Sequence, residues 1–232
     1  MADWRQMTAT SVRARVRAEM TDEIKTVARR HLATDGANLS LRAVARDLGM
    51  ASSAVYRYFA SRDELLTAMI IDAYDALGTA AEASVRPGPF QDRFLRTCHA
   101  VRDWALANPH EWALIYGSPV PDYQAPRDTV EPAVRVVVVI GTIVGEAAAA
   151  GEIEAGERIT GRLGEELAHI TELVAPGTAP QVVGRAMAAW LHLCGAVSAE
   201  LFGQLNNTIE ARREFFELQM RGAAAVVSRP VT

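Results

Sequence analysis

Residues 39–66 carry the pattern that most restricts the fold of this chain, because they predict two short helices joined by a glycine turn. Ser40 is placed to cap the first helix. The apolar face of that helix is formed at helical spacing by Leu41, Val44, Ala45 and Leu48. Gly49 provides the positive φ that ends it, and a second short helix then turns Val55 and Phe59 inward. This arrangement is the one that places a second helix in the major groove of DNA.

The segment resembles the TetR family of transcriptional regulators over roughly residues 18–68. The resemblance is carried by Val44 to Ala51, by Val55 to Phe59 and by Ser61 to Leu66, where Ser61 and Glu64 form a capping box. It implies a repressor that binds double-stranded DNA at a palindromic operator as a homodimer. It also implies that a small, largely apolar effector releases the protein from this DNA. Motif matches keep a false-positive risk, so an ordinary helical pair is the alternative.

Eight side chains of this segment are candidate DNA contacts. They are Ser40, Arg42, Ser52, Ser53, Tyr56, Arg57, Tyr58 and Arg62. Arg57 is the best base reader, because its guanidinium can pair with N7 and O6 of guanine. The resemblance implies phosphate contacts for Ser40 and Tyr56, and a backbone clamp for Arg62, where the family usually has lysine. Tyr58 stands where a histidine is often found, and Arg42 either reaches a base edge or is a solvated surface residue.

The net charge of −4 is unevenly distributed along the chain. Residues 1–62 hold 11 Lys and Arg against 6 Asp and Glu, whereas the remainder holds 13 against 22. A basic amino-terminal module on an acidic body fits nucleic-acid binding by one part only. Arg13, Arg15 and Arg17 either enter an adjacent minor groove or belong to a solvated tail.

The fold class predicted for the whole chain is all-α. Half of the residues are hydrophobic, and Pro and Gly stand at the ends of helical patterns. We expect a basic flexible arm over 1–17, a DNA-binding domain over 18–66 and a helical ligand-binding and dimerisation domain over 67–232. The helices expected after the reading helix span about 61–84, 90–107, 109–116, 127–150, 152–174, 180–204 and 209–227.

The carboxy-terminal region also resembles a ligand-binding domain of one branch of the TetR family. The resemblance is carried by Asn108-Pro109, by Ile115 to Tyr123 and by Trp190 to Gly195, although Cys194 stands where that branch usually has His. The candidate ligand contacts are aromatic, and they are Phe94, Trp104, Trp112, Tyr116 and Trp190. Their alternative is the hydrophobic core.

We expect the homodimer to form through the last two helices, where small and apolar residues recur. The candidate interface residues are Ala188, Leu191, Gly195, Ala199, Phe202, Phe215, Leu218 and Ala223.

Other classes of function find no support in the sequence. It has no P-loop, GxSxG, HExxH or paired-cysteine signature, so neither catalysis, nor a cofactor, nor a metal is expected. Cys98 and Cys194 fit a reduced, cytoplasmic protein, and a single disulfide between them is the alternative. The apolar run 134–140 is too brief to span a membrane. The non-enzymatic alternative is an architectural DNA-binding protein, which would protect DNA almost without regard to sequence.

Overall fold

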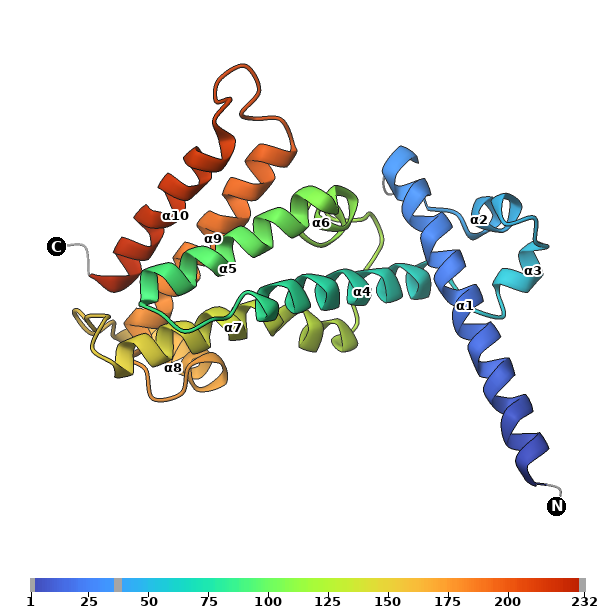
Figure 1. Ribbon diagram of the computed structural model, residues 1–232, viewed down its shortest axis with the longest axis horizontal. Coiled ribbons are helices and arrows are strands. Elements are labelled where there is room, and N and C mark those ends of the chain that lie inside the picture. Colours follow the sequence, from blue (N-terminus) through green and yellow to red (C-terminus); the bar gives the residue numbers. More distant parts are fainter. Residues whose placement is uncertain (1–2, 36–38, 230–232) are drawn as a thin grey trace. The chain divides into compact units, whose positions relative to one another are not determined.

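The fold is all-α, as the sequence predicts, in a computed structural model that describes residues 3–35 and 39–229 (Figure 1). No strand occurs within these two ranges. The elements are α1 (Asp3–Asp35), α2 (Leu41–Asp47), α3 (Ser52–Val55), α4 (Arg62–Ala83), α5 (Phe90–Ala107), α6 (Pro109–Tyr116), the 3₁₀ turn η1 (Arg127–Thr129), α7 (Val130–Ala149), α8 (Gly161–Val174), α9 (Pro180–Leu201) and α10 (Arg212–Ser228).

The chain divides into two compact units. The head consists of residues 1–72 together with 118–129, and the body consists of 73–117 and 130–232. The boundary therefore falls inside α4, after Asp72, whereas the sequence places it after residue 66. The segment 118–129 belongs to the head although both of its sequence neighbours belong to the body, which no local pattern indicates.

Helix α1 begins at Asp3, so residues 3–17 of the expected flexible arm are helical. The sequence from Asp3 to Asp35 contains neither Pro nor Gly, and nothing in it interrupts the helical hydrogen bonds. Arg15 and Glu19 lie one turn apart, with 3.6 Å between Nε and Oε1, and such a pair adds modestly to helix stability.

The head packs around the apolar positions that the sequence identifies. Val55 and Phe59 are buried, and Gly49 has the positive φ of 65° that ends the helical turn. Ser40 occupies the N-cap position of α2 with extended backbone, but its side chain makes no capping hydrogen bond. Its hydroxyl therefore is not used by the helix that it precedes.

The start of α4 forms the capping arrangement expected from its sequence. The backbone N–H of Glu64 donates to Oγ of Ser61 over 3.1 Å. The Glu64 carboxylate in turn accepts from the backbone N–H of Ala60. One N–H that the first turn leaves without a helical partner is thereby satisfied, and the carboxylate also holds the residue before the cap, which fixes where α4 begins.

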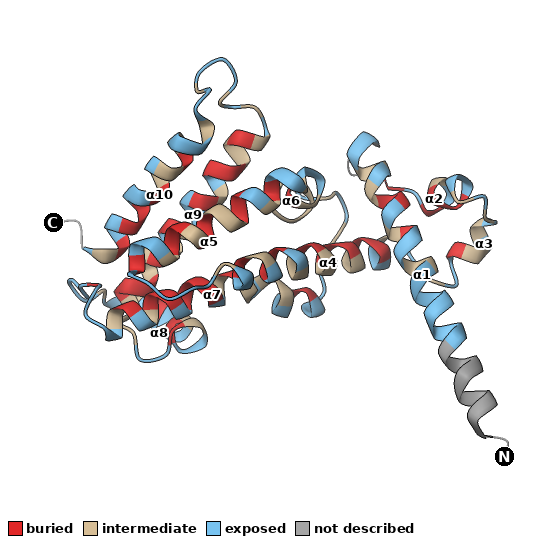
Figure 2. Ribbon diagram, in the orientation of Figure 1, coloured by how far each residue is buried: buried red, intermediate tan, exposed pale blue. Residues whose placement is uncertain are grey.

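The core of the body is formed by α5, α7, α9 and α10 with contributions from α4 and α6. Its largest fully buried side chains include Phe94, Trp112, Leu193 and Phe216. Buried and exposed residues alternate along α9 and α10 (Figure 2), as expected for helices with one side in a core.

One helix of the body is shorter than the sequence indicates. A helix over 152–174 is expected, but α8 begins only at Gly161. Gly156 and Gly161 both have positive φ, 74° and 70°, which is incompatible with a continuous right-handed helix. Residues 152–160 are therefore not helical, and α8 begins only after them.

Two helices of the body are long and apolar enough to cross a membrane. They span 127–149, which includes η1, and 180–201, with mean hydropathy 1.7 and 1.3. Both have the contacts of core helices, because α7 packs against α5, α8 and α9, and α9 packs against α5, α6, α7, α8 and α10. One side of each helix therefore belongs to the core of the body.

Candidate nucleic-acid interface

The candidate DNA contacts lie mostly on the solvent-exposed side of the head. Four of them, all with polar side chains, are exposed, and these are Ser40, Arg42, Ser53 and Arg57. Tyr56 has 46% of its surface exposed, which is high for an aromatic residue. Ser52, Tyr58 and Arg62 are half-buried. The guanidinium of Arg57 makes no hydrogen bond or ion pair with the described residues, so it is available to a ligand.

The reading helix itself is shorter than expected. Helix α3 ends at Val55, and Tyr56, Arg57 and Tyr58 lie in the turn that follows it rather than on its face. The backbone N–H groups of Tyr58 and Phe59 both donate to the carbonyl oxygen of Val55, over 2.9 and 3.1 Å. The turn is thus held in place by backbone hydrogen bonds although it is no longer regular helix.

Arg17 of α1 contacts this turn in two places. Its Nη2 donates to the carbonyl oxygen of Arg57 over 3.0 Å, and its guanidinium lies 5.2 Å from the centre of the Tyr58 ring. A cation over an aromatic face is attracted by the ring quadrupole. The sequence indicates Arg17 only as part of a basic arm. Its role as a support for Arg57 could not be found from spacing, because the two residues lie 40 positions apart.

The half-buried Arg62 faces the segment 118–129. Its Nη1 lies 3.5 Å from the carbonyl oxygen of Pro121 and 3.6 Å from Oδ1 of Asp63. The same segment is joined to α4 by a hydrogen bond of 2.9 Å between the hydroxyl groups of Thr67 and Tyr123. These contacts lie within the head, and they attach the segment 118–129 to the first turns of α4.

Ion pairs join the remaining helices of the head. Asp72 on α4 accepts from Lys25 over 2.8 Å and from Arg29 over 2.9 Å, and both of these lie on α1. Burial disfavours the charge on Lys25, but its hydrogen bonds with Asp72 and Asp22 outweigh burial and raise its pKa above the ordinary value. His31 on α1 similarly contacts Asp47 at the end of α2, over 2.8 Å.

The five aromatic residues predicted to bind a ligand lie in the body, and the structure brings three of them together. Tyr116 lies between Trp112 and Trp190, with ring centres 4.5 and 5.9 Å away. Trp112 is fully buried, and its indole N–H donates to Oγ of Ser198 over 3.1 Å. Burial raises the pKa of the Tyr116 hydroxyl well above its ordinary value, so this group is a neutral donor.

The other two aromatic residues lie outside that cluster. Phe94 is fully buried and packs against Phe90, with 5.7 Å between ring centres, and Trp104 is half-buried against the core. A cavity of about 30 Å³ borders Trp190 and is otherwise apolar. This volume holds about one water molecule, so this cavity admits no larger ligand in this conformation.

The two cysteines are free thiols. Burial raises the pKa of Cys98 well above the ordinary value and raises that of Cys194 to about 12. Both groups are therefore neutral at physiological pH, which disfavours reaction as thiolates.

An apolar face remains exposed on the last two helices of the body. Leu191 and Leu218 have 68% and 66% of their surface exposed, and Phe202 has 50%. A groove of about 420 Å³ runs between α9 and α10, and the residues that line it are Ala188, Ala189, His192, Leu218, Gln219, Gly222, Ala223 and Val226. Of the predicted interface residues, Ala188, Leu218 and Ala223 line this groove.

Comparison with known proteins decides the family. Residues 24–69 match the family described as "Bacterial regulatory proteins, tetR family", and residues 94–223 match the "Tetracyclin repressor-like, C-terminal domain". The second match alone covers more than half of the chain, and the first contains all of the helix-turn-helix described above. The chain belongs to the TetR family.

Relatives and solved structures agree with membership of the TetR family. The chain is 41% identical over 196 residues to the HTH-type transcriptional regulator Rv1816 of Mycobacterium tuberculosis, with 81% of this chain and 83% of the relative covered. The regulator Mb1846 of Mycobacterium bovis matches equally well over the same share of each chain, at 41% identity over 196 residues with 81% and 83% covered.

Among solved structures, the regulatory protein SCO4313 superimposes with a TM-score of 0.74 at 31% identity over 90% of this chain and 97% of that one. A TetR family regulator from Rhodococcus RHA1 has a TM-score of 0.64 at 17% identity over 91% of this chain and 98% of that one, and it shows the shared fold alone. The chain is therefore a DNA-binding transcriptional regulator and not an enzyme.

Proposed function

We propose that this TetR family regulator is a cytoplasmic repressor that binds a palindromic operator as a homodimer and leaves it when a small, largely apolar effector binds the body. Tyr56, Arg57 and the other candidate contacts would face the operator in each half-site. A single helix-turn-helix reads only a few base pairs, so two copies related by symmetry are needed for useful specificity.

The observation that carries the proposal is the exposed apolar face of α9 and α10. Leucines with two thirds of their surface in water are costly on a monomer, and contiguous apolar surface usually marks an interface. Gly195 and Gly222 lie on these two helices, and a Cβ added at either would meet no atom within 4 Å. Their lack of a side chain is thus not required by the fold of one copy, but it would let a second pair of helices approach closely.

Two helices from each copy would form a four-helix bundle. The same patch would face itself across a two-fold axis, which is the commonest symmetry of soluble homo-oligomers. A two-fold axis in the protein is also what a palindromic operator requires. The proposed interface and the proposed operator symmetry therefore support each other.

The effector would bind in the body, and Phe94, Trp104, Trp112, Tyr116 and Trp190 are the candidates that the sequence offers for its contacts. Trp190 borders a small, otherwise apolar cavity. Because that cavity holds about one water molecule, binding among these rings would require α7 and α9 to move apart. Release from DNA would follow from a higher affinity of the effector for the conformation that does not bind the operator.

The test replaces Leu218 by Arg and compares it with Leu173→Arg on α8. The two leucines are equally exposed, at 66% and 67%, but only Leu218 lines the groove between α9 and α10. We expect wild type and Leu173→Arg to sediment as dimers at micromolar concentration and to select a palindrome from random DNA. Leu218→Arg should sediment as a monomer and lose about 100-fold or more in affinity for that DNA, since each half-site then binds alone.

Two results would contradict the proposal. A wild-type monomer in the ultracentrifuge at micromolar concentration would exclude the homodimer. Protection of DNA without regard to sequence would instead favour an architectural protein.

A further inference from the structure

The outer side of α7 carries a row of exposed valines that the core of the body does not explain. Val130, Val134 and Val138 recur every four residues and have 58%, 40% and 39% of their surface exposed. The opposite side of the same helix is buried, so α7 is apolar on both sides. A helix that is apolar all round is normally covered all round.

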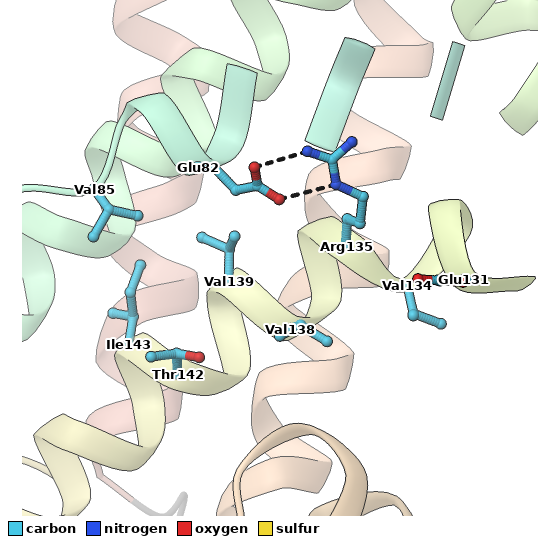
Figure 3. Close-up of a pocket in the computed structure, with 9 residues that line it drawn as sticks. All are labelled: Glu82, Val85, Glu131, Val134, Arg135, Val138, Val139, Thr142 and Ile143. Carbon is cyan, nitrogen blue, oxygen red and sulfur yellow. Dashed lines mark hydrogen bonds and ion pairs between the residues drawn. The ribbon is translucent and has the colours of Figure 1, made fainter. Parts of the chain in front are cut away.

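Two of these valines, Val134 and Val138, line a groove between α7 and the end of α4. The groove has a volume of about 360 Å³, and its lining residues are Glu82, Val85, Glu131, Val134, Arg135, Val138, Val139, Thr142 and Ile143 (Figure 3). Val139 and Ile143 are buried, whereas Val85 is exposed at the far side. The volume lies within the range of small-molecule sites, about 300–1,000 Å³. All of these residues belong to the body.

Arg135 closes one end of the groove and is already saturated with partners. Its five N–H groups donate to the carbonyl oxygen and a carboxylate oxygen of Asp75, to the Thr79 hydroxyl and to both carboxylate oxygens of Glu82, over 2.7 to 3.2 Å. The guanidinium lies against Gly78, where an added Cβ would stand 2.8 Å from its Nε. Arg135 therefore has no donor left for an anionic ligand.

The charge that remains available in the groove is negative. Glu131 is exposed and makes no hydrogen bond or ion pair with the described residues. Thr142 supplies an exposed hydroxyl near the other end. An apolar wall with one uncompensated carboxylate is complementary to a molecule with an aliphatic or aromatic body and one positive charge.

We propose that the groove between α4 and α7 is the effector site and that it takes a small amphipathic organic cation. The inference rests on the proposed function, and it chooses between two places in the body. The cavity beside Trp190 has a volume of about 30 Å³, whereas the groove has about 360 Å³ without any movement of helices. The valines bury the apolar body, Glu131 pairs with the cationic group, and the ligand lies beside the bridge from Arg135 to α4.

The experiment titrates the full-length protein with hexyltrimethylammonium and, as matched probes, with 1-hexanol and hexanoate. Valine methyl NMR signals report the site directly. We expect the cation to shift Val85, Val134 and Val138, 1-hexanol to shift the same signals at higher concentration, and hexanoate to leave them unchanged. Glu131→Gln should weaken the cation about fivefold and leave 1-hexanol unaffected, as expected for one exposed ion pair.

Val138→Trp should fill the groove and abolish the shifts. The matched control is Leu163→Trp on α8, which is also exposed but lines none of the grooves described, and it should bind as wild type does. Saturating cation should lower the affinity of wild type and Leu163→Trp for the selected palindrome by about fivefold or more. Val138→Trp should bind that DNA and no longer respond.

Several outcomes would overturn the assignment. Equal binding of cation and hexanoate would remove the charge argument, and shifts at the Trp190 indole without shifts at the groove would place the ligand in the aromatic cluster. Valine shifts that depend on protein concentration without any probe would mean that a second copy covers the groove. A saturated groove with unchanged DNA affinity would show that it is not the effector site.

Wild type that selects no palindrome would instead refute the proposed function, and the NMR titration would still decide the binding site.

Discussion

In the head, the proposed contacts are polar side chains whose useful atoms are exposed, whereas in the body the exposed features are apolar grooves. Tyr56 and Arg57 lie in the turn that follows α3, so a few neighbouring residues are enough to place them on the surface. The groove beside Arg135 instead needs residues of α4 and α7 that lie some 50 positions apart in the chain. A DNA-reading surface can thus be encoded locally, while a ligand site depends on which helices pack together.

The contrast between a polar head surface and an apolar body has one clear exception, which is a polar pair buried inside the body. Substitutions at this pair have the largest expected effect. Arg102 on α5 and Glu200 on α9 have 7% and 6% of their side chains exposed and form two hydrogen bonds of 2.7 and 2.6 Å. Glu200→Ala leaves the buried guanidinium with only the exposed Asp103, 3.4 Å from its Nη1, as a carboxylate partner, so we expect a loss of about 3–5 kcal/mol in the free energy of unfolding. Urea denaturation measures it.

Two further variants control this prediction. Arg102→Met combined with Glu200→Leu should recover most of the stability, because no uncompensated charge then remains. Glu166→Ala removes the exposed pair with Arg162, whose side chains are 90% and 55% exposed, and should change stability by less than about 0.5 kcal/mol. Equal losses at Glu200 and Glu166 would contradict the importance of burial.

Within the head, Arg57→Ala sharpens the distinction between reading a base and holding a phosphate. We expect a loss of about 1–3 kcal/mol in discrimination at one base pair of each half-site. Tyr56→Phe and Arg62→Ala should instead weaken binding to all sequences similarly. Gel shifts on the selected palindrome and on scrambled DNA measure both effects. If Arg57→Ala lowered the two affinities equally, Arg57 would be a phosphate contact.

The segment 118–129 is covalently continuous with the body but packs in the head, so its attachment tests how separate the units are. Tyr123→Phe removes the hydroxyl that bonds Thr67 and keeps the ring, with an expected loss of about 0.5–1.5 kcal/mol in stability. Thr67→Val should cost a similar amount, and the double variant little more than either, because both remove one bond. Additive losses in urea denaturation would mean that the two groups act independently.

The smallest expected effect concerns the pH response of the body. Burial, followed by the charge of Arg213, lowers the pKa of His99 below its ordinary value, although Glu217 and Asp103 oppose the shift. The unfolded chain therefore takes up this proton first, and stability falls as pH drops below about 6.5 towards the lower pKa of the folded state. His99→Gln should flatten the decline in Tm between pH 7.5 and 5.5. An unchanged slope, with His110→Gln as the control, would exclude His99 as its source.

The sequence predicted the elements whose signals are local. Helix ends are fixed by Gly49 and Asn108, and helix starts by the capping pair Ser61 and Glu64 and by Pro109 and Pro180 at first helical positions. The helix-turn-helix and the all-α class followed from these positions and from apolar spacing. The start of α1 was missed because high charge density resembles an arm, although no residue there disrupts a helix.

The parts of the candidate sites that the sequence could not supply depend on distant pairs. Arg17 beneath Arg57 and Tyr123 beside Thr67 join residues 40 and 56 positions apart. Periodicity identifies an apolar face but not its neighbour, so Phe94 and Trp112 could be read equally as pocket or core. The structure places both at zero exposure, whereas it leaves Val134 and Val138 in water.

The amino-acid sequence by itself determined that the reading module has two short helices separated at Gly49 and which polar side chains follow that turn, because those properties depend on neighbours within a turn or two. The tertiary structure alone decided that residues 118–129 pack in the head, that Trp112, Tyr116 and Trp190 lie together, and that a groove forms between α4 and α7. Burial is set by the sum of contacts from several helices, and that sum has no counterpart in any one segment of the chain.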